Sequence, residues 1–180
     1  MQFLRKIKNS IFSLIILILL VISFFVFKSS LEKEKIYSPK MSDNNIFTDF
    51  RAQTLVEEKT INFEKAVSGK SFYLINIWSS WCEPCKDESE YLLELKNNTP
   101  IMMIGINYKD KKKNALNFLK LYGDPFEQIF VDKQGLISIN FGAYGVPETF
   151  LINNDNKVLK KYIGPLNDEN VDEIKKITKN

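Results

Sequence analysis

The chain has 180 residues, of which 44% are hydrophobic, so it can fold as one domain of ordinary size plus a short additional segment. Arg5, Lys6 and Lys8 supply the formal charge of +3, and the balanced remainder argues against nucleic acid as a partner, because phosphate binding needs a net basic surface. With no histidine and only two cysteines, the chain cannot build a Ser-His-Asp or Cys-His site or attach c-type haem, and a four-ligand zinc site is improbable.

An uncharged apolar run, 11–27 (IFSLIILILLVISFFVF), follows the basic N-terminus. Its length of about 17 residues is just enough to cross a bilayer as a helix. A cleaved signal peptide is the main alternative, but its hydrophobic run is shorter and ends at small residues, whereas this run ends at Val26-Phe27-Lys28. A buried core helix fits less well because the run has no polar face. We therefore predict an uncleaved transmembrane anchor.

The residues on either side of this run indicate its orientation. Basic residues lie in the segment 1–10, and the positive-inside rule places that end in the cytoplasm. The segment 28–45 is polar, mixed in charge and unpatterned, which suits a flexible linker. We expect the remaining domain, 46–180, on the far side of the membrane.

Within this domain, short apolar runs alternate with amphipathic stretches, and the last two runs are joined by Asn154-Asp155-Asn156, a hairpin signal. The expected strands are 72–78, 101–107, 130–131, 148–153 and 157–163, and the expected helices are 83–97, 111–121 and 170–178. This order predicts an α/β fold with a central mixed sheet, parallel in the middle and antiparallel at one edge, flanked by helices.

The two cysteines, Cys82 and Cys85, lie three positions apart where the strand 72–78 gives way to a helix. On one helical turn they can close into a disulfide or open as a dithiol. Free amides and the helix dipole stabilise a thiolate at Cys82, the expected nucleophile, while Cys85 would resolve the mixed disulfide. A structural disulfide is the alternative, although closing about four residues gains little unfolded-state entropy. A metal half-site shared between two chains is a second alternative.

The neighbours of the cysteines modify this chemistry. Glu83 opposes thiolate formation and Lys86 favours it, so the net shift of the Cys82 pKa has no predicted sign. Pro84 lacks an amide hydrogen and suits the first turn of a helix. Trp81 either shields the pair, presents a flat contact surface, or packs into the core.

Three segments together resemble one family. They are 78–85 (WSSWCEPC), 105–110 (GINYKD) and 144–152 (YGVPETFLI), and the last two are similar to blocks of the CcmG/DsbE family within the thioredoxin superfamily. The resemblance extends from about residue 47 to the C-terminus and implies a thioredoxin-like fold.

The resemblance also implies a function and partners. Members of this family are anchored in the bacterial inner membrane, face the periplasm, and reduce the disulfide of apocytochrome c before haem attachment. By this resemblance, the partners are apocytochrome c or its haem-ligation machinery and a CcdA/DsbD-like membrane thiol transporter that resets the Cys82–Cys85 disulfide. No metal or cofactor is expected beyond this redox-active pair.

The family motif assigns roles to further residues. Pro147 matches a proline that is cis and faces the cysteines, and the backbone of Val146 would bind an extended substrate. Glu88 and Glu148 match acidic residues that lie near the redox site in the family. A carboxylate there could accept or supply a proton during exchange, a role for which this chain has no histidine. The alternatives are a trans turn proline for Pro147 and an exposed helical position for Glu88.

Two other functions remain open from the sequence. The dipeptide Glu83-Pro84 also occurs between the cysteines of related ResA/TlpA-like thiol reductases, so a general periplasmic oxidant or reductase is one of them. The other is a non-catalytic thioredoxin-like binding module. The redox potential and catalytic turnover distinguish the three.

Overall fold

A computed structural model describes residues 2–31, 50–67 and 69–179 of the chain. It divides the chain into two compact units, 1–40 and 41–180. The first unit holds the helix α1 (Gln2–Leu31), along which apolar side chains between Ile11 and Phe27 are exposed. Within the described residues, no helix is both long enough and apolar enough to cross a membrane.

The predicted linker, 28–45, differs from the structure at its beginning and lies outside the described residues from 32 onward. The helix α1 continues to Leu31 because 28–31 contains no proline or glycine that would end it.

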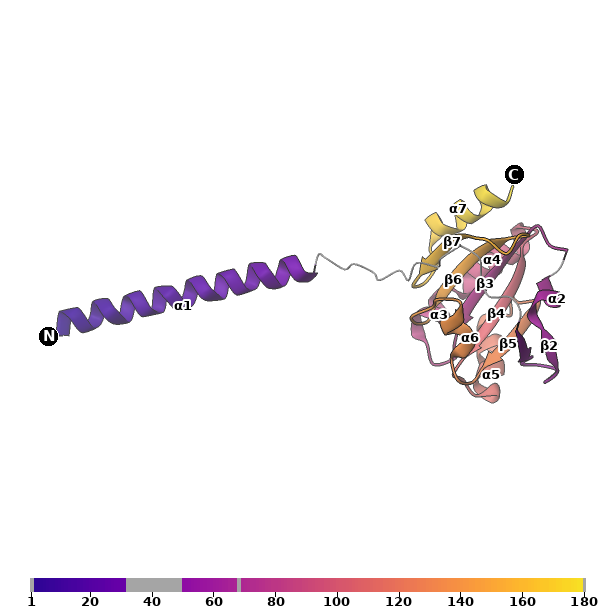
Figure 1. The fold of residues 1–180 in the computed structure, drawn as a ribbon, viewed down its shortest axis with the longest axis horizontal. Coiled ribbons are helices and arrows are strands. Elements are labelled where there is room, and N and C mark those ends of the chain that lie inside the picture. Colours follow the sequence, from indigo (N-terminus) through magenta and orange to yellow (C-terminus); the bar gives the residue numbers. More distant parts are fainter. Residues whose placement is uncertain (1, 32–49, 68, 180) are drawn as a thin grey trace. The chain divides into compact units, whose positions relative to one another are not determined.

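The second unit is built on a five-stranded sheet with the order β5-β4-β3-β6-β7 (Figure 1). The strands are β3 (Phe72–Trp78), β4 (Met102–Tyr108), β5 (Gln128–Asp132), β6 (Glu148–Asn153) and β7 (Val158–Ile163). Strands β3, β4 and β5 are parallel, whereas β6 and β7 run antiparallel. The predicted central mixed sheet is therefore confirmed.

Side chains of the central strands alternate between two apolar clusters because successive residues of a strand point to opposite faces. Leu74 and Trp78 of β3 pack with both cysteines and with the helices α4 (Ser89–Asn98), α5 (Lys112–Tyr122) and α7 (Asp168–Thr178), and we call this side the cysteine face. Ile75 and Ile77 pack on the other side with the helices α2 (Phe63–Val67) and α6 (Leu136–Asn140), and we call it the opposite face. Helices thus flank both faces of the sheet.

The helices on the cysteine face are α3 (Glu83–Asp87), α4 (Ser89–Asn98), α5 (Lys112–Tyr122) and α7 (Asp168–Thr178). The sequence predicts one helix over 83–97, but the structure divides it at Glu88. The hydroxyl of Ser89 donates to the carbonyl oxygen of Cys85 at 3.0 Å, a bond from a side chain to the preceding turn that bends helices. The single helix predicted over 83–97 was therefore wrong, and the structure has two consecutive helices in its place.

Four short elements were not predicted. They are β1 (Arg51–Gln53), β2 (Thr60–Asn62), α2 (Phe63–Val67) and α6 (Leu136–Asn140). The strands β1 and β2 pair with each other, and each has only three residues. Elements of three to five residues are too short to display a hydrophobic period.

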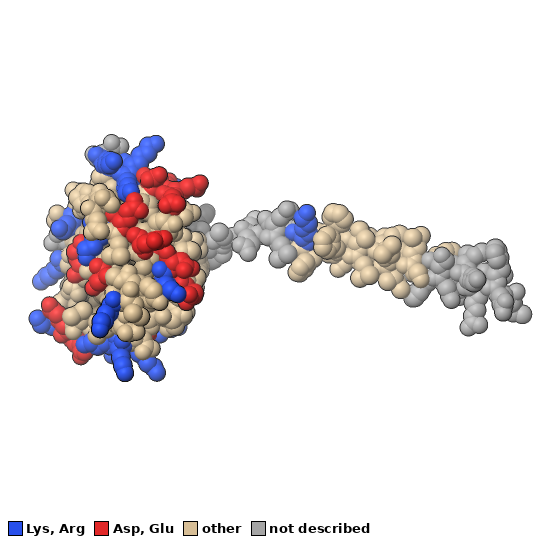
Figure 2. All heavy atoms as spheres, turned by 180° about the vertical axis from the view of Figure 1, so that it is seen from behind, with Lys and Arg blue, Asp and Glu red and all other residues tan. Residues whose placement is uncertain are grey.

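The surface of the domain carries charges of both signs. Figure 2 shows acidic side chains gathered across the middle of one face, with basic side chains around them. This face is not the basic surface that phosphate binding needs.

Candidate functional site

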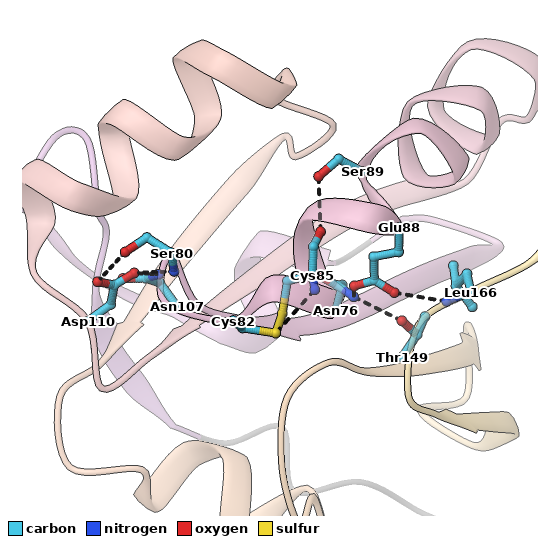
Figure 3. The surroundings of a disulfide bond; sticks show 10 residues. All are labelled: Asn76, Ser80, Cys82, Cys85, Glu88, Ser89, Asn107, Asp110, Thr149 and Leu166. Carbon is cyan, nitrogen blue, oxygen red and sulfur yellow. Dashed lines mark hydrogen bonds between the residues drawn. A yellow bond between two sulfur atoms is a disulfide. The ribbon is translucent and has the colours of Figure 1, made fainter.

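The cysteine pair lies at the carboxyl end of β3, at the start of α3 (Figure 3). Cys82 and Cys85 form a disulfide, and their Cα atoms are 5.3 Å apart. Cys82 is the N-cap residue of α3, and its sulfur accepts a hydrogen bond from the backbone amide of Cys85 at 3.2 Å. Pro84 occupies the first turn, where its missing amide hydrogen costs nothing. The local sequence thus places one sulfur at the helix end and the other one turn inside.

The charges beside the cysteines pair with each other. The ammonium of Lys86 lies 3.0 Å from the carboxylate of Glu83, and hydrogen bonding to Glu83 raises the pKa of the lysine. The two side chains therefore form one ion pair near the surface, next to the cysteines in the sequence. From the sequence, Glu83 and Lys86 were expected to act on Cys82 in opposite directions, and the structure shows in addition that they form an ion pair with each other.

Asp110 fixes the loop that leads into Cys82. Its carboxylate accepts hydrogen bonds from the backbone amide of Ser80 at 2.6 Å, the hydroxyl of Ser80 at 2.8 Å and the amide side chain of Asn107 at 3.1 Å. Burial alone would raise the pKa of this carboxyl, but these hydrogen bonds outweigh it and lower the pKa. The family block at 105–110 therefore contributes a loop anchor.

Trp81 is 58% exposed beside the disulfide. Its indole nitrogen donates to the carbonyl oxygen of Lys109 at 3.2 Å, and its ring lies 6.4 Å from that of Tyr108. The core-packing alternative was wrong, and the tryptophan presents a flat apolar surface to solvent.

Glu88 is fully buried beside the turn of α3 that carries Cys85 (Figure 3). Its carboxylate accepts hydrogen bonds from the side chain of Asn76 at 2.8 Å and the backbone amide of Leu166 at 3.1 Å. The amide of Asn76 also donates to the hydroxyl of Thr149 at 2.9 Å. Burial raises the pKa of Glu88 to about 7 despite these two bonds. The exposed-helix alternative for Glu88 was wrong.

The Val146–Pro147 peptide bond is cis. Since β6 runs antiparallel to β3, Pro147 precedes β6 at the end of the sheet where β3 leads into the cysteines. Val146 packs against the cluster that contains Cys82 and Cys85. Val146 also packs against the cluster on the opposite face, so the proline loop lies across the end of the sheet where the disulfide is found.

Glu148 is also buried, but it is directed to the opposite face, since it pairs with Ile77 rather than with Asn76. One of its oxygens accepts hydrogen bonds from the backbone amides of Tyr144 and Gly145 at 2.7 and 3.0 Å. The other lies 2.8 Å from the ammonium of Lys161. Its described polar contacts are thus with the proline loop and with Lys161, and not with the sulfurs.

The structure brings Cys82, Cys85, Glu88 and Val146–Pro147 to one end of the sheet and directs the carboxylate of Glu148 to the opposite face. Four supporting residues, Asn76, Ser80, Asp110 and Thr149, were not among the predicted site residues. A polar Asn76 within an apolar strand was the available signal for one of them. Among the described residues, no group of three or more Cys, His, Asp or Glu side chains is placed to hold a metal ion.

A mixed sheet flanked by helices, with a Cys-x-x-Cys disulfide and a cis-proline at the same end of the sheet, defines the thioredoxin-like class of domains. A solved secreted disulfide oxidoreductase of Mycobacterium tuberculosis, described as homologous to E. coli DsbE, has this fold. It is 18% identical, covers 72% of this chain and 96% of its own, and superposes with a TM-score of 0.62.

The family model Redoxin matches residues 41–177, so the chain belongs to the redoxin family. It is 41% identical over 102 residues to the thiol:disulfide interchange protein CycY of Rhizobium leguminosarum bv. viciae, covering 57% of this chain and 54% of that protein. It is 37% identical over 121 residues to DsbE of Pasteurella multocida, covering 67% and 66% respectively. The resemblance to the DsbE proteins is confirmed, and the chain spans about half to two thirds of the length of these relatives.

Proposed function

We propose that this chain is a thiol-disulfide oxidoreductase that reduces disulfides in protein substrates. The observation that carries the proposal is the Cys82–Cys85 disulfide at the start of α3, at the same end of the sheet as the cis-proline loop. The names of the DsbE and CycY relatives, thiol:disulfide interchange proteins, support the same chemistry.

The reaction begins from the reduced pair. The thiolate of Cys82 attacks one sulfur of the substrate disulfide, and the other substrate sulfur leaves as a thiol after taking up a proton. The thiolate of Cys85 then attacks the sulfur of Cys82, which releases the second substrate thiol and closes the Cys82–Cys85 disulfide. The substrate disulfide gains two electrons, and the cysteine pair loses the same two electrons.

Glu88 is the group best placed to move the proton of Cys85. It is buried beside the turn that carries this cysteine, and its pKa of about 7 lets it take up or release a proton near neutrality. The chain has no histidine that would compete for this role. The flat, exposed face of Trp81 and the backbone at Val146–Pro147 would contact the substrate beside the disulfide.

The finer part of the proposal is that the substrate is apocytochrome c, with the domain held on the periplasmic side of the bacterial inner membrane. The uncharged run 11–27 in the helix α1, with exposed apolar side chains, supports an anchor, and the basic residues before it support a cytoplasmic N-terminus. A CcdA/DsbD-like membrane protein would return the electrons.

Substitution of the cysteines tests the reaction. In the full chain, reduced with a small dithiol, Cys82→Ala should abolish reduction of a peptide disulfide that carries the Cys-x-x-Cys-His pattern of apocytochrome c. Cys85→Ala should accumulate a mixed disulfide with that peptide on a non-reducing gel. Retained exchange in Cys82→Ala would remove the nucleophile assignment, and an inactive parent chain would favour a non-catalytic binding module.

A general thiol reductase or oxidant is the second candidate, favoured by the Glu83-Pro84 dipeptide between the cysteines. The equilibrium potential of the Cys82–Cys85 couple, measured against glutathione and a stronger dithiol, separates the two directions. A strongly reducing value supports a reductase of cytochrome c maturation, whereas a value near that of disulfide-forming enzymes supports an oxidant.

A further inference from the structure

We propose that Lys161 is a positioning residue for the exchange reaction, acting through Glu148 to hold the backbone of Val146 in place for an extended substrate. The inference rests on the proposed function, because it assigns a role to a residue that lies away from the sulfurs. Lys161 comes from β7, outside the three family blocks, and the sequence patterns do not single it out.

The ammonium of Lys161 contacts residues on both sides of the cis-proline, namely Gly142 and Tyr144 before it and Glu148 after it. It lies 2.8 Å from the carboxylate of Glu148, donates to the carbonyl oxygen of Gly142 at 2.8 Å, and sits 4.4 Å from the centre of the Tyr144 ring. Only 19% of the lysine side chain is exposed. A surface lysine normally keeps its ammonium in water, so this degree of contact indicates a fixed position.

Glu148 transmits this contact to the loop backbone. While one oxygen faces Lys161, the other accepts both the Tyr144 and Gly145 amides, the two immediately before Val146. On the other side, the carbonyl oxygen of Pro147 accepts a hydrogen bond from the amide of Gly164 at 3.0 Å. The backbone is thereby tied down on both sides of the Val146–Pro147 bond.

Between these ties, the backbone of Val146 remains available. In the described parts of the chain, its amide and carbonyl oxygen have no hydrogen-bond partner, although the adjacent Gly145 amide and Pro147 carbonyl both do. An extended peptide can pair with such a free amide and carbonyl as it pairs with a strand edge. A backbone held rigid for pairing binds more tightly than one that must be ordered on binding.

Without the ammonium of Lys161, the buried carboxylate of Glu148 loses its positive partner and would be drawn toward water. The loop amides would lose their fixed acceptor, and Val146 would sample other positions. The expected consequence is weaker substrate binding with little change in the chemistry at the sulfurs, since Lys161 contacts neither cysteine in the described structure.

The test compares Lys161→Met with Lys160→Met in the full chain. Lys160 precedes Lys161 on β7 and forms an ion pair with Glu173, so it is a matched control directed to the other face of the sheet. We expect Lys161→Met to raise KM for a disulfide-containing peptide about tenfold, which corresponds to a loss of about 1.4 kcal/mol of binding free energy. The value of kcat should stay within about twofold of the parent value. Lys160→Met should leave both values near those of the parent chain.

Two further variants cover a folding defect in Lys161→Met. Lys161→Arg keeps the positive charge, so its KM should stay much closer to the parent value than that of Lys161→Met. Glu148→Gln keeps an oxygen acceptor for the two loop amides but removes the ion pair with Lys161, so it should raise KM. The exchange rate with a small disulfide, which needs no backbone pairing, and the potential of the Cys82–Cys85 couple should stay near the parent values in Lys161→Met.

The outcomes separate the inference from the proposed function. A parent chain that exchanges with the peptide, together with an unchanged KM in Lys161→Met and Glu148→Gln, overturns the positioning role alone. A parallel loss of peptide and small-disulfide exchange also overturns it, because that pattern is a general structural defect. A parent chain inactive on both compounds overturns the proposed function instead.

Discussion

The two buried glutamates at the site end of the sheet have opposite surroundings. Glu88, on the cysteine face, is bonded to neutral donors, an asparagine side chain and a backbone amide, and burial raises its pKa to about 7. Glu148, on the opposite face, lies against the ammonium of Lys161 and accepts two loop amides. The first environment suits proton exchange and the second suits a fixed anchor. Similar burial therefore does not imply a similar role.

The largest effect is expected from removal of the anchor. Glu148→Ala leaves Lys161 charged and largely buried, and breaking one partner of a buried ion pair typically costs about 3–5 kcal/mol of unfolding free energy. Urea unfolding of the oxidised parent chain and of Glu148→Ala measures this difference in unfolding free energy. Glu57→Ala, which removes a surface ion pair with Lys59, should change the free energy little. A loss below about 1 kcal/mol for Glu148→Ala would contradict the buried-pair account.

The pH dependence of stability tests the other glutamate. Because its pKa is raised from 4.5 to about 7 on folding, the folded state binds the proton more tightly than the unfolded state. Its favourable contribution is fully present below pH 4.5 and is lost as the pH rises through about 7, a change of about 3 kcal/mol. Urea unfolding between pH 4 and 8 should show this decline in the parent chain relative to Glu88→Gln. Parallel pH curves for the two proteins would show that Glu88 keeps an ordinary pKa.

The contrast between the glutamates was not accessible from the sequence, although much of the fold was. The strands β3 and β6 have their predicted bounds because each is a short, largely apolar or β-favouring segment that is followed by polar or turn residues. Glu88 stands among polar residues, Asp87-Glu88-Ser89-Glu90, which read as a solvated helix face. Its burial depends on Asn76 and Leu166, which are distant in the sequence and meet it only in the folded sheet.

The same distinction applies to the rest of the site. The cysteine pair and the proline block are local motifs, so the sequence located them directly. Lys161 contacts the loop before the cis-proline, and Asp110 contacts the loop that leads into Cys82. A local sequence pattern does not predict which distant loop such a side chain will contact. Short-range spacing predicts the reacting atoms here, and tertiary contacts supply the groups that hold them.

Asp110 extends the comparison to a half-exposed carboxylate, and the smallest effect is expected there. Although partial burial raises the pKa of Asp110, hydrogen bonds from Ser80, Asn107 and Lys111 lower it overall, so the folded state favours the charged form. Its contribution is present above the unfolded pKa and is lost as the pH falls through the lower folded pKa, the opposite sign to Glu88. Asp110→Ala should lower the free energy of unfolding by about 1–2 kcal/mol near pH 7, since several hydrogen bonds are lost together but solvent screens the group.

Urea unfolding of Ser80→Ala provides the matched comparison. This variant removes the hydroxyl bond and keeps the amide bond at 2.6 Å, so it should lower the free energy of unfolding by less than half as much as Asp110→Ala. Equal losses in the two variants would mean that the hydroxyl, and not the amide bond that fixes the approach to Cys82, accounts for the stabilisation.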